Sequence, residues 1–566
     1  MLLMTALAAG SSGCLVSEDY DSTMSGSAST TASGSSFVES QSIYVDLSEG
    51  KVSEDNSTWT SISTSKTSLL GGSAKIDYTE DSSGNSTNLI RINLTDTTKN
   101  TGVHLSGSME NGGVKIQTST SFETGVYLES ASISSSNYPC IDMTKGGSAS
   151  VFLIGDNTLV DGRKYGYGYG DSASTCDSGR VGSEEGSDSK GTLYSKGSMT
   201  ISGSGSLSIT QGYKNCIASK DGILTIEGGT YDLKNYTGSS SGKNGLFGGQ
   251  GIVVDGGSVA FDGQGVVSTS ELRKANAFKT DDENYSSSYV KINGGSVSAT
   301  TYNGKGIAAP VVQIAGGENR FTVTGVTGYT SDSNKTGSYY DADGVKCSGS
   351  ITFAPEGIEG DTSVSITGGS TIVSAENDDG INAGSSIAIS GGFVYVKSKG
   401  DGIDSNGTVS VSGGVTAVCT YANDNSPIDF DSSFKVTGGK LLAVGTDQMG
   451  EMAKVSSSIK LVNYTSCNGS ANTYFAINDS SGENVVAVKA PYAYSTALYM
   501  DNSLSGTYTA YKSASVSGTE YASGTEFYLP ATSASGTAVS SKTASTSASS
   551  TSSNTPGSSS GPGGNR

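Results

Sequence analysis

The chain carries EGIEGDTSVSITGG at residues 356–369, DGINAGSSIAISGG at 379–392, DGIDSNGTVSVSGG at 401–414 and SPIDFDSSFKVTGG at 426–439. These segments align residue by residue, and each alternates apolar and polar residues before a final Gly-Gly pair. Alternation with a period of two predicts β-strands. The aligned apolar residues form three sets, which are Ile358, Ile381, Ile403 and Ile428, then Val364, Ile387, Val409 and Phe434, then Ile366, Ile389, Val411 and Val436. Stacked about 4.8 Å apart, each set becomes a continuous apolar column, so the segments predict an all-β solenoid of the parallel β-helix type.

The Gly-Gly ending also recurs upstream, in LTIEGG, IVVDGG, VKINGG and VQIAGG. The second glycines of all eight endings are Gly229, Gly257, Gly295, Gly317, Gly369, Gly392, Gly414 and Gly439, and subtraction gives intervals of 28, 38, 22, 52, 23, 22 and 25 residues. The shortest intervals are near 22 residues and some are longer, which predicts rungs of fixed length with loops inserted on one side. Propeller blades would need about 40 to 45 residues each. Glycine allows the positive φ that sharp corners require.

The composition narrows the possible partners. The formal net charge is −20, which argues against nucleic-acid binding because phosphate contacts need clustered Lys and Arg. His104 is the only histidine, so catalytic triads and histidine acid–base chemistry have little support.

The two ends of the chain differ from its middle. MLLMTALAAGSSGC at residues 1–14 resembles a bacterial lipoprotein signal peptide, in which Cys14 would carry the lipid, and its apolar run is too short to span a bilayer. We therefore expect a lipoprotein on the outside of a bacterial cell, with plain secretion as the alternative. Residues 15–40 are a Ser/Thr/Gly-rich linker, 41–449 the β-helix, 450–530 a C-terminal β-module or cap, and 531–566 a disordered Ser/Thr/Gly-rich tail.

Six cysteines remain after Cys14, an even number that permits disulfides outside the cell. Cys216 and Cys347 fall at positions that align with small interior residues. This placement favours thiols packed in the core over disulfides.

Three long segments resemble motifs of a known family, in the family's order. They are GVYLESASISSSNYPCIDMTKGGSASVFLIGDNTLVDG at residues 125–162, GTLYSKGSMTISGSGSLSITQGYKNCIASKDGILTIEGG at 191–229 and APEGIEGDTSVSITGGSTIVSAENDDGINAG at 354–384. The chain resembles the bacterial carbohydrate-binding domain family of right-handed parallel β-helix proteins, related in fold to calcium-dependent polysaccharide lyases, over about residues 85 to 515. The resemblance implies a right-handed single-stranded parallel β-helix that is non-catalytic, binds calcium and has relatives associated with cellulose and acidic pectic chains.

Acidic residues recur beside the Gly-Ile step of the aligned rungs. Those directly before the glycine are Asp343, Glu356, Asp379 and Asp401, and the residues two positions after it are Glu359, Asn382, Asp404 and Asp429. Carboxylates stacked about 5 Å apart repel by roughly 3 kcal/mol at an effective dielectric constant of 20, so such a column needs a cation or protonation. Ca²⁺ suits this mixture of oxygen ligands, with Asp378 and Asn406 completing the site. The alternative is a row of solvated corner residues.

The earlier rungs depart from this acidic pattern. Asn215, Asn244, Asn276 and Lys305 stand where the later rungs have an acid, which puts any metal site there in doubt. The sequence therefore predicts the metal-bearing part between Asp343 and Asp431.

Aromatic residues are candidates for sugar contacts, because flat rings stack on sugar faces. Tyr395 is predicted to point outward from a strand, and YGYGYG places Tyr165, Tyr167 and Tyr169 at alternating positions. The alternative for that segment is an ordinary Gly-Tyr surface loop.

The sequence thus predicts a monomeric cell-surface protein that binds a cellulose-type or pectic polysaccharide with calcium support. One alternative is a calcium-dependent lyase of the pectate type, which would need a Lys or Arg as the base. Lys279, Lys346 and Lys399 lie near acids but are more simply salt-bridging corner residues. The other alternative is a surface adhesin that binds no sugar.

Overall fold

A computed structural model describes the chain from Phe37 to Ser547 with internal gaps. The described residues are 37–80, 84, 86–96, 98–118, 122–163, 191–211, 214–237, 240–241, 244–263, 266–268, 271–272, 275–281, 284–302, 304–324, 335–340, 346–351, 355–421, 425–447 and 450–547. Their regular secondary structure is almost entirely β-strand, and the helical segments among them are two 3-10 turns, η1 (Leu70–Gly72) and η2 (Glu451–Lys454). No helix in this described part is long and apolar enough to cross a membrane.

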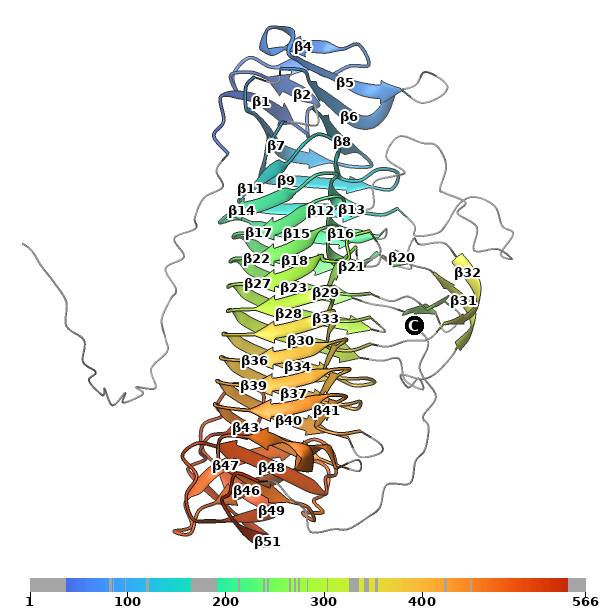
Figure 1. Cartoon of the computed structure of the whole chain (residues 1–566). Helices are drawn as coiled ribbons and strands as arrows, with labels where there is room; N and C mark the ends of the chain where they lie inside the picture. Colours follow the sequence, from blue (N-terminus) through green and yellow to red (C-terminus); the bar gives the residue numbers. More distant parts are fainter. Residues whose placement is uncertain are drawn as a thin grey trace, which may run out of the picture. The chain divides into compact units, whose positions relative to one another are not determined.

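The chain passes repeatedly through three strand positions. In one pass it forms β35 (Ile381–Ala383), β36 (Ser386–Ile389) and β37 (Phe393–Ser398), and in the next β38 (Ile403–Ser405), β39 (Thr408–Val411) and β40 (Val415–Thr420). Each strand pairs in parallel with its counterpart in the next pass. We call one pass a rung and the three rows of paired strands the first, second and third stacks (Figure 1).

The stacks extend over most of the chain. The first contains β8 (Gly113–Gln117), β10 (Ile141–Lys145), β13 (Gly191–Ser195), β16 (Asn215–Ser219), β21 (Asn244–Gly248), β26 (Phe278–Thr280), β29 (Ile307–Ile314), β33 (Ile358–Ile366), β35, β38 and β41 (Ile428–Phe430). The second contains β9 (Thr124–Ser135), β11 (Ala149–Ile154), β14 (Met199–Gly203), β17 (Ile223–Ile226), β22 (Gly251–Val254), β27 (Tyr289–Ile292), β29, β33, β36, β39, β42 (Ser433–Val436) and β44 (Ser456–Ser457). The third contains β9, β12 (Asp156–Asp161), β15 (Ser206–Gln211), β18 (Thr230–Lys234), β23 (Ser258–Gly263), β28 (Ser296–Tyr302), β30 (Glu318–Thr324), β34 (Ser370–Ala375), β37, β40 and β43 (Lys440–Gly445).

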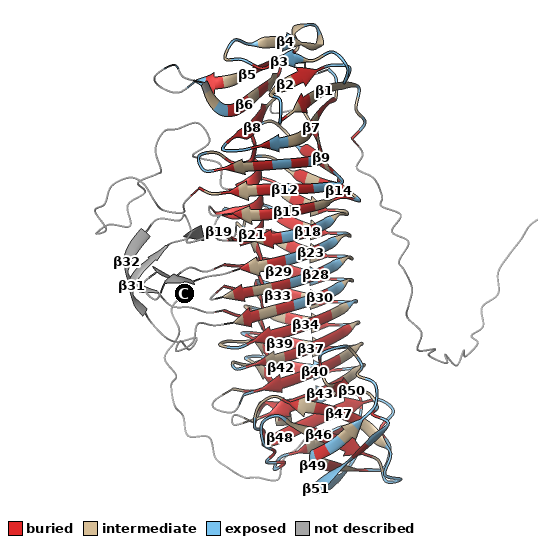
Figure 2. Cartoon of the chain, turned by 180° about the vertical axis from the view of Figure 1, so that it is seen from behind, coloured by how far each residue is buried: buried red, intermediate tan, exposed pale blue. Residues whose placement is uncertain are grey.

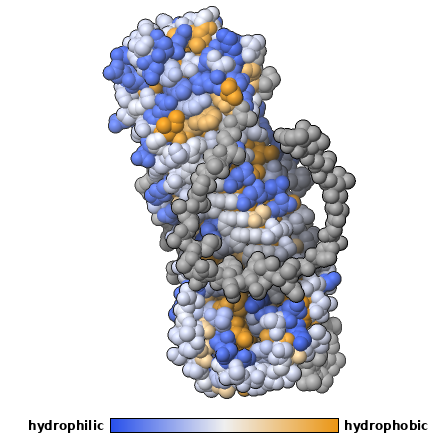
Figure 3. Space-filling view, turned by 90° about the vertical axis from the view of Figure 1, so that its left-hand side faces the viewer, coloured by the Kyte–Doolittle hydropathy of each residue, from blue (hydrophilic) through white to orange (hydrophobic). Residues whose placement is uncertain are grey.

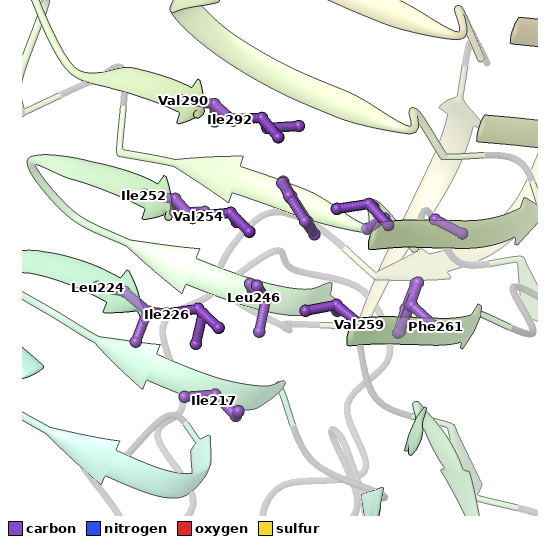
Figure 4. Packing of buried hydrophobic residues seen from close by; sticks show 14 of the residues in the cluster. Ile217, Leu224, Ile226, Leu246, Ile252, Val254, Val259, Phe261, Val290 and Ile292 are labelled. Carbon is purple, nitrogen blue, oxygen red and sulfur yellow. The ribbon is translucent and has the colours of Figure 1, made fainter. Parts of the chain in front are cut away.

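The register confirms the predicted apolar columns. Ile381 pairs with Ile403, and Ile387 pairs with Val409, each on the same face of its stack. One hydrophobic cluster contains inward residues of all three stacks, such as Ile381, Ile387 and Val394. Figure 4 shows this packing around Leu246, and Figure 2 shows buried residues along the stacked strands. The fold is thus all-β with one large, mostly parallel sheet, and it is consistent with a β-helix-like solenoid.

The long Gly-Gly intervals contain inserted strands, as the sequence predicts. Each insertion falls in the connection from the third stack to the first. The inserted strands are β19 (Tyr236–Thr237), β20 (Ser240–Ser241), β24 (Val266–Ser268), β25 (Glu271–Leu272), β31 (Lys335–Tyr340) and β32 (Lys346–Ile351). The last four pair into a small separate sheet.

Antiparallel pairings accompany the first parallel ones at the N-terminal end of the stacks. The strands there are β1 (Gln41–Asp46), β2 (Lys51–Ser53), β3 (Thr60–Ser61), β4 (Thr67–Leu69), β5 (Ala74–Glu80) and β6 (Ser86–Leu94), and β7 (Thr101–Met109) follows. β1 and β7, β7 and β9, and β6 and β8 pair in parallel, whereas β1–β2, β2–β3, β4–β5 and β5–β6 are antiparallel. The end of a stack exposes unpaired backbone groups, and these hairpins cover it.

The strands of a C-terminal β-module follow the last rung. β45 (Leu461–Tyr464) and β48 (Thr496–Asp501) pair with each other, and β48 also pairs antiparallel with β43. A five-stranded sheet has the order β50 (Phe527–Tyr528), β47 (Asn484–Ala490), β46 (Thr473–Asn478), β49 (Thr507–Ser517) and β51 (Ser533–Thr543). β51 places Ser/Thr-rich sequence beyond residue 530 as an edge strand on β49.

The second glycine of each Gly-Gly pair has positive φ, from +70° to +87°. An added Cβ at Gly392 would lie 2.5 Å from the carbonyl oxygen of Gly369 and 2.6 Å from the carbonyl carbon of Gly368. The glycine pairs are therefore needed both for their conformation and for close stacking.

We expect Gly392→Ala to lower the free energy of unfolding by about 3 kcal/mol or more, because it adds a backbone clash to the cost of a left-handed conformation. Gly482→Ala is the matched control, since Gly482 has φ +90° and nothing within 4 Å of an added Cβ. It should cost only about 1 kcal/mol. Urea unfolding of the two variants checks this, and equal losses would contradict the role of stacking.

Candidate functional site

A column of polar side chains lies where the chain enters the first stack. We call it the corner column, and its members are Asn215, Asn244, Asn276, Lys305, Glu356, Asp379, Asp401 and Ser426. Backbone hydrogen bonds connect successive members or their neighbours, for example from Gly357 N to Asp379 O at 3.0 Å and from Gly402 N to Ser426 O at 3.0 Å. The alignment of the early Asn and Lys positions with the later acids is thus confirmed.

Several side chains of the corner column share one hydrogen-bonding role. Asn244, Asn276, Asp379 and Asp401 each accept the backbone N–H of the next member, as Asn276 Oδ1 does from Lys305 at 2.8 Å, Asp379 Oδ1 from Asp401 at 2.7 Å and Asp401 Oδ1 from Ser426 at 2.5 Å. The asparagines also bond to one another, since Asn244 Nδ2 donates to Asn215 Oδ1 at 2.9 Å. Asp379 and Asp401 therefore continue an asparagine ladder with carboxyl groups.

The sequence pattern alone does not predict this hydrogen-bonding role, because it presents the asparagines only as departures from an acidic pattern. The signal was present, because Asn recurs at the same rung position in Asn215, Asn244 and Asn276. Asparagine and aspartate have the same shape and differ in whether the second atom donates.

A second column runs beside the first on the outer face of the first stack. Glu359 pairs in register with Asn382, Asn382 with Asp404, and Asp404 with Asp429, as the sequence alignment predicts. Asn382 Nδ2 donates to Asp404 Oδ2 at 2.8 Å and to Asp379 Oδ2 at 3.3 Å. Asn382 therefore joins the two columns.

Lys305 neutralises the upstream end of the acidic part. Its Nζ lies 3.1 Å from Glu356 Oε2, and it also pairs with Glu359. Burial alone would lower the pKa of Lys305, but the charges of Glu356 and Glu359 outweigh it and raise that pKa above its usual range. Lys305 is thus held as a cation, and it supplies part of the counter-charge that the acids need.

No lysine pairs with the downstream acids in the same way among the described contacts. Burial, followed by the charges of Asp378 and Asp401, raises the pKa of Asp379 well above its usual range. Burial raises the pKa of Asp401 to about 7, where the Ser426 N–H opposes the shift and the Asp429 charge adds to it. Burial and then Asp429 and Asp431 raise the pKa of Asp404 to about 6. Burial therefore favours the neutral, protonated forms of these carboxyl groups.

Several residues predicted to bind calcium have other partners in the structure. Asp379 accepts hydrogen bonds on both carboxyl oxygens, and Asn406 is exposed with its backbone N–H bonded to Ala383 O. Within the described ranges no group of three or more His, Cys, Asp or Glu side chains is arranged to hold a metal ion. Asp343 lies outside the described residues. These hydrogen bonds engage carboxyl oxygens that the sequence assigns to a metal ion, and the calcium site stays a prediction.

The structure describes one of the four tyrosines that are predicted to bind sugar. Tyr395 points away from the main core as predicted, but it is only 4% exposed. The C-terminal module covers it, because Tyr395 belongs to an apolar cluster with Phe475 and Phe527 of that module. Tyr395 is therefore not accessible to a polysaccharide on the surface. Tyr165, Tyr167 and Tyr169, like Cys14, lie outside the described residues.

A second cluster surrounds the single histidine, which lies in β7. The His104 ring stacks between Tyr44 at 4.6 Å and Tyr127 at 4.2 Å. Its Nδ1 is 2.8 Å from Glu129 Oε1, and its Nε2 is 3.2 Å from Glu39. Both ring nitrogens therefore face carboxylates, and the ring is held between two tyrosines.

The described cysteine thiols agree with the prediction of core packing. Cys140, Cys216, Cys419 and Cys467 are free and buried. Cys216 lies in the main core, whereas Cys419 lies under the C-terminal module. The side chain of Cys347 is outside the described set.

The stacked rungs and their polar corner define a class of all-β repeat proteins that present long strand faces. A family model described as carbohydrate-binding domain-containing protein matches residues 93–356 and 353–485. The match covers more than half of the chain, so the chain belongs to this family of carbohydrate-binding domain-containing proteins.

The other comparisons add little. The chain matches no curated protein. A solved structure of a polysaccharide lyase-like protein from C. thermocellum, a gadolinium derivative, has 18% identity and a TM-score of 0.33. The match covers 51% of this chain and 98% of that one. At this score the likeness supports no inference about fold or function.

The raised pKa of Asp401 predicts a pH-dependent stability. An unfolded aspartate has a pKa of about 3.9, so the folded protein binds more protons between about pH 4 and 7 and loses stability as pH rises through this window. Asp401→Asn keeps the acceptor for Ser426 and removes the charge. We expect it to raise the free energy of unfolding at pH 8 by on the order of 1 kcal/mol and to flatten the pH dependence.

Denaturant unfolding at pH 5 and pH 8 measures both effects. Asp232→Asn is the control, because Asp232 is an exposed carboxylate outside the column. Equal destabilisation by Asp401→Asn at both pH values would contradict a proton-bearing ladder and would favour a role for the carboxylate charge, as in cation binding.

The Lys305 pairs give a separate prediction. We expect Lys305→Met to cost about 3 to 5 kcal/mol at pH 8, because it leaves Glu356 and Glu359 without a counter-charge. Adding Glu356→Gln should restore part of the loss. Lys51→Met, which breaks an exposed pair with Glu49, is the control and should change the unfolding midpoint little. The prediction is wrong if the two lysine variants unfold alike.

Proposed function

We propose that this protein binds a polysaccharide on the outside of a bacterial cell and does not cleave it. The observation that carries the proposal is membership of the carbohydrate-binding domain-containing family across residues 93–485. The stacked strands support it, because parallel rows of side chains repeat along each stack and can meet successive units of a chain. Figure 3 shows one face, which is mostly hydrophilic or near neutral, with apolar residues in separate patches.

We propose that the protein does not cleave its ligand because of how its candidate basic side chains are paired. A lyase base must lose a proton, whereas Lys305 is held as a cation by Glu356 and Glu359. His104 has both ring nitrogens facing carboxylates. Lys399 is exposed and Lys279 partly buried in the structure, and the side chain of Lys346 lies outside the described residues. A pectate-type lyase is the runner-up.

The finer proposal concerns the ligand and calcium. The family resemblance implies cellulose-type or pectic chains, and an acidic chain would be repelled by a protein of net charge −20 unless a cation intervened. Ca²⁺ at the acidic corner, with Asp379, Asp401 and Asp404 among the oxygen donors, would supply that bridge. The raised pKa values of Asp401 and Asp404 support a need for either a proton or a cation there.

The remaining expectations are also proposals. We propose that the three stacks close into a right-handed single-stranded parallel β-helix, which the cluster shared by all three stacks supports. The proposed location is a lipid anchor at Cys14, followed by the linker. We propose a monomer that binds no nucleic acid, consistent with the net charge of −20.

Retention by insoluble polysaccharides tests the main proposal. We expect the purified chain to bind at least one of cellulose, mannan or calcium-pectate gel, and to release no ultraviolet-absorbing unsaturated product from polygalacturonate. Retention by none of them would contradict binding, and product release would establish the lyase instead. Thermal unfolding with Ca²⁺ and with EDTA tests the metal, since a bound ion must raise the melting temperature.

A further inference from the structure

A short column of exposed side chains lies just after the third stack. Its members are Glu376, Lys399 and Tyr421, the residues that follow β34, β37 and β40. Lys399 N donates to Ala375 O at 3.0 Å, and Tyr421 N donates to Ser398 O at 3.1 Å, so the three residues occupy successive rungs. All three are exposed, and Tyr421 is 40% exposed, one of few large aromatic or apolar side chains to be so among the described residues.

The C-terminal module places a second ring beside this column. Tyr492 lies in the loop between β47 and β48, and its ring is 5.5 Å from that of Tyr421 at an interplanar angle of 84°. Burial raises the pKa of Tyr492 to about 12, with the charge of Glu376 as the next cause. The two tyrosines therefore form an aromatic corner near Glu376.

The loop that carries Tyr492 is fixed at several points. Tyr494 exchanges backbone hydrogen bonds with Gly469 at 2.8 and 3.1 Å, and Ser495 N donates to Gly445 O at 2.9 Å. Gly445 ends β43, the last strand of the third stack, and β48 pairs with β43 along its length. The aromatic corner is thus built jointly by the stack and the module, and it is formed before any ligand arrives.

These residues have the chemistry of a sugar subsite. An exposed ring with a second ring at right angles offers a flat surface and a wall for the apolar face of a pyranose. Lys399 and Glu376 add a donor and an acceptor for hydroxyl groups on the neighbouring rungs. The rungs are about 4.8 Å apart, which is close to the length that one hexose adds to an extended chain. Successive rungs can therefore meet successive sugar units.

The charges favour a neutral ligand. The charges of Lys399 and Glu376 cancel within this column. The acidic corner column lies a few residues further along the chain, at Asp379 and Asp401. A polyuronate would meet this negative potential without any excess of positive charge in the subsite. A neutral hexose chain has no such penalty.

We propose that Tyr421, Tyr492, Lys399 and Glu376 form a subsite for an extended, neutral hexose polysaccharide. The proposal rests on the proposed function, carbohydrate binding, and assigns it to one place on the molecule. Tyr421 provides the stacking surface, Tyr492 bounds it, and the charged pair orients the next units.

Affinity electrophoresis of the full chain in hydroxyethylcellulose, mannan and polygalacturonate tests the proposal. We expect retardation by at least one of the neutral polymers, and a roughly tenfold weaker affinity for Tyr421→Ala. Tyr492→Ala should weaken binding similarly, and Lys399→Gln with Glu376→Gln by a few-fold. The matched control is Tyr521→Ala, because Tyr521 is 47% exposed but packs on Phe393 at the opposite end of the third-stack strands. The control should bind as the wild type does, and unfolding curves should show every variant folded.

The outcomes separate the subsite from the general function. If the wild type binds a neutral polymer and both tyrosine variants keep its affinity, the subsite is wrong and carbohydrate binding stands. Binding of polygalacturonate alone, with calcium and without loss in Tyr421→Ala, would also overturn the subsite. If the wild type binds none of the polymers under any condition, the proposed function fails as well.

Discussion

Stacking identical strand positions at one fixed spacing forces each side chain to contact its counterparts in the rungs above and below. For apolar residues this contact is favourable whenever the stacked side chains have similar volumes, as in the column from Ile358 to Ile428. For polar residues the contact succeeds only if a donor meets an acceptor. Asparagine satisfies this condition with itself, which is why Asn215, Asn244 and Asn276 can follow one another. Carboxylates cannot, so their column needs Lys305 at one end and protons or a cation at the other.

This constraint explains how much of the structure could be predicted from sequence. The registers of the last four rungs were predicted residue by residue, because period-two alternation and the Gly-Gly pairs each fix the same alignment. The position of the inserted loops followed from the lengths of the Gly-Gly intervals. The strands at the two ends of the stacks are harder to predict, because residues that cover a stack need only pair at an edge. β51 shows this, since a Ser/Thr-rich strand with mostly exposed side chains resembles a linker in composition.

The site was predicted less completely than the fold, for a physical reason. Sequence alignment places Asp379, Asp401 and Asp404 in columns but does not show which atoms their oxygens contact. The structure assigns those oxygens to backbone N–H groups and to Asn382. Tyr395 illustrates the same limit, because alternation predicts that it faces outward but does not reveal that the module covers it. The exposure of a side chain depends on residues that are distant in sequence. The aromatic corner likewise depends on two residues distant in sequence, Tyr421 and Tyr492.

The confinement of the inserted strands to one corner bears on how such a chain can change during evolution. The eight connections that contain a Gly-Gly pair each have three residues between the second-stack and third-stack strands. An added Cβ at Gly392 would lie 2.5 Å from the carbonyl oxygen of Gly369 in the adjacent rung, so these turns are closely packed. The corner after the third stack accommodates connections from three residues, between Gln211 and Asn215, to more than thirty, between Thr324 and Ile358. Lineages can therefore lengthen, shorten or exchange this one edge, and duplicate whole rungs, while the register of the remaining protein is inherited unchanged.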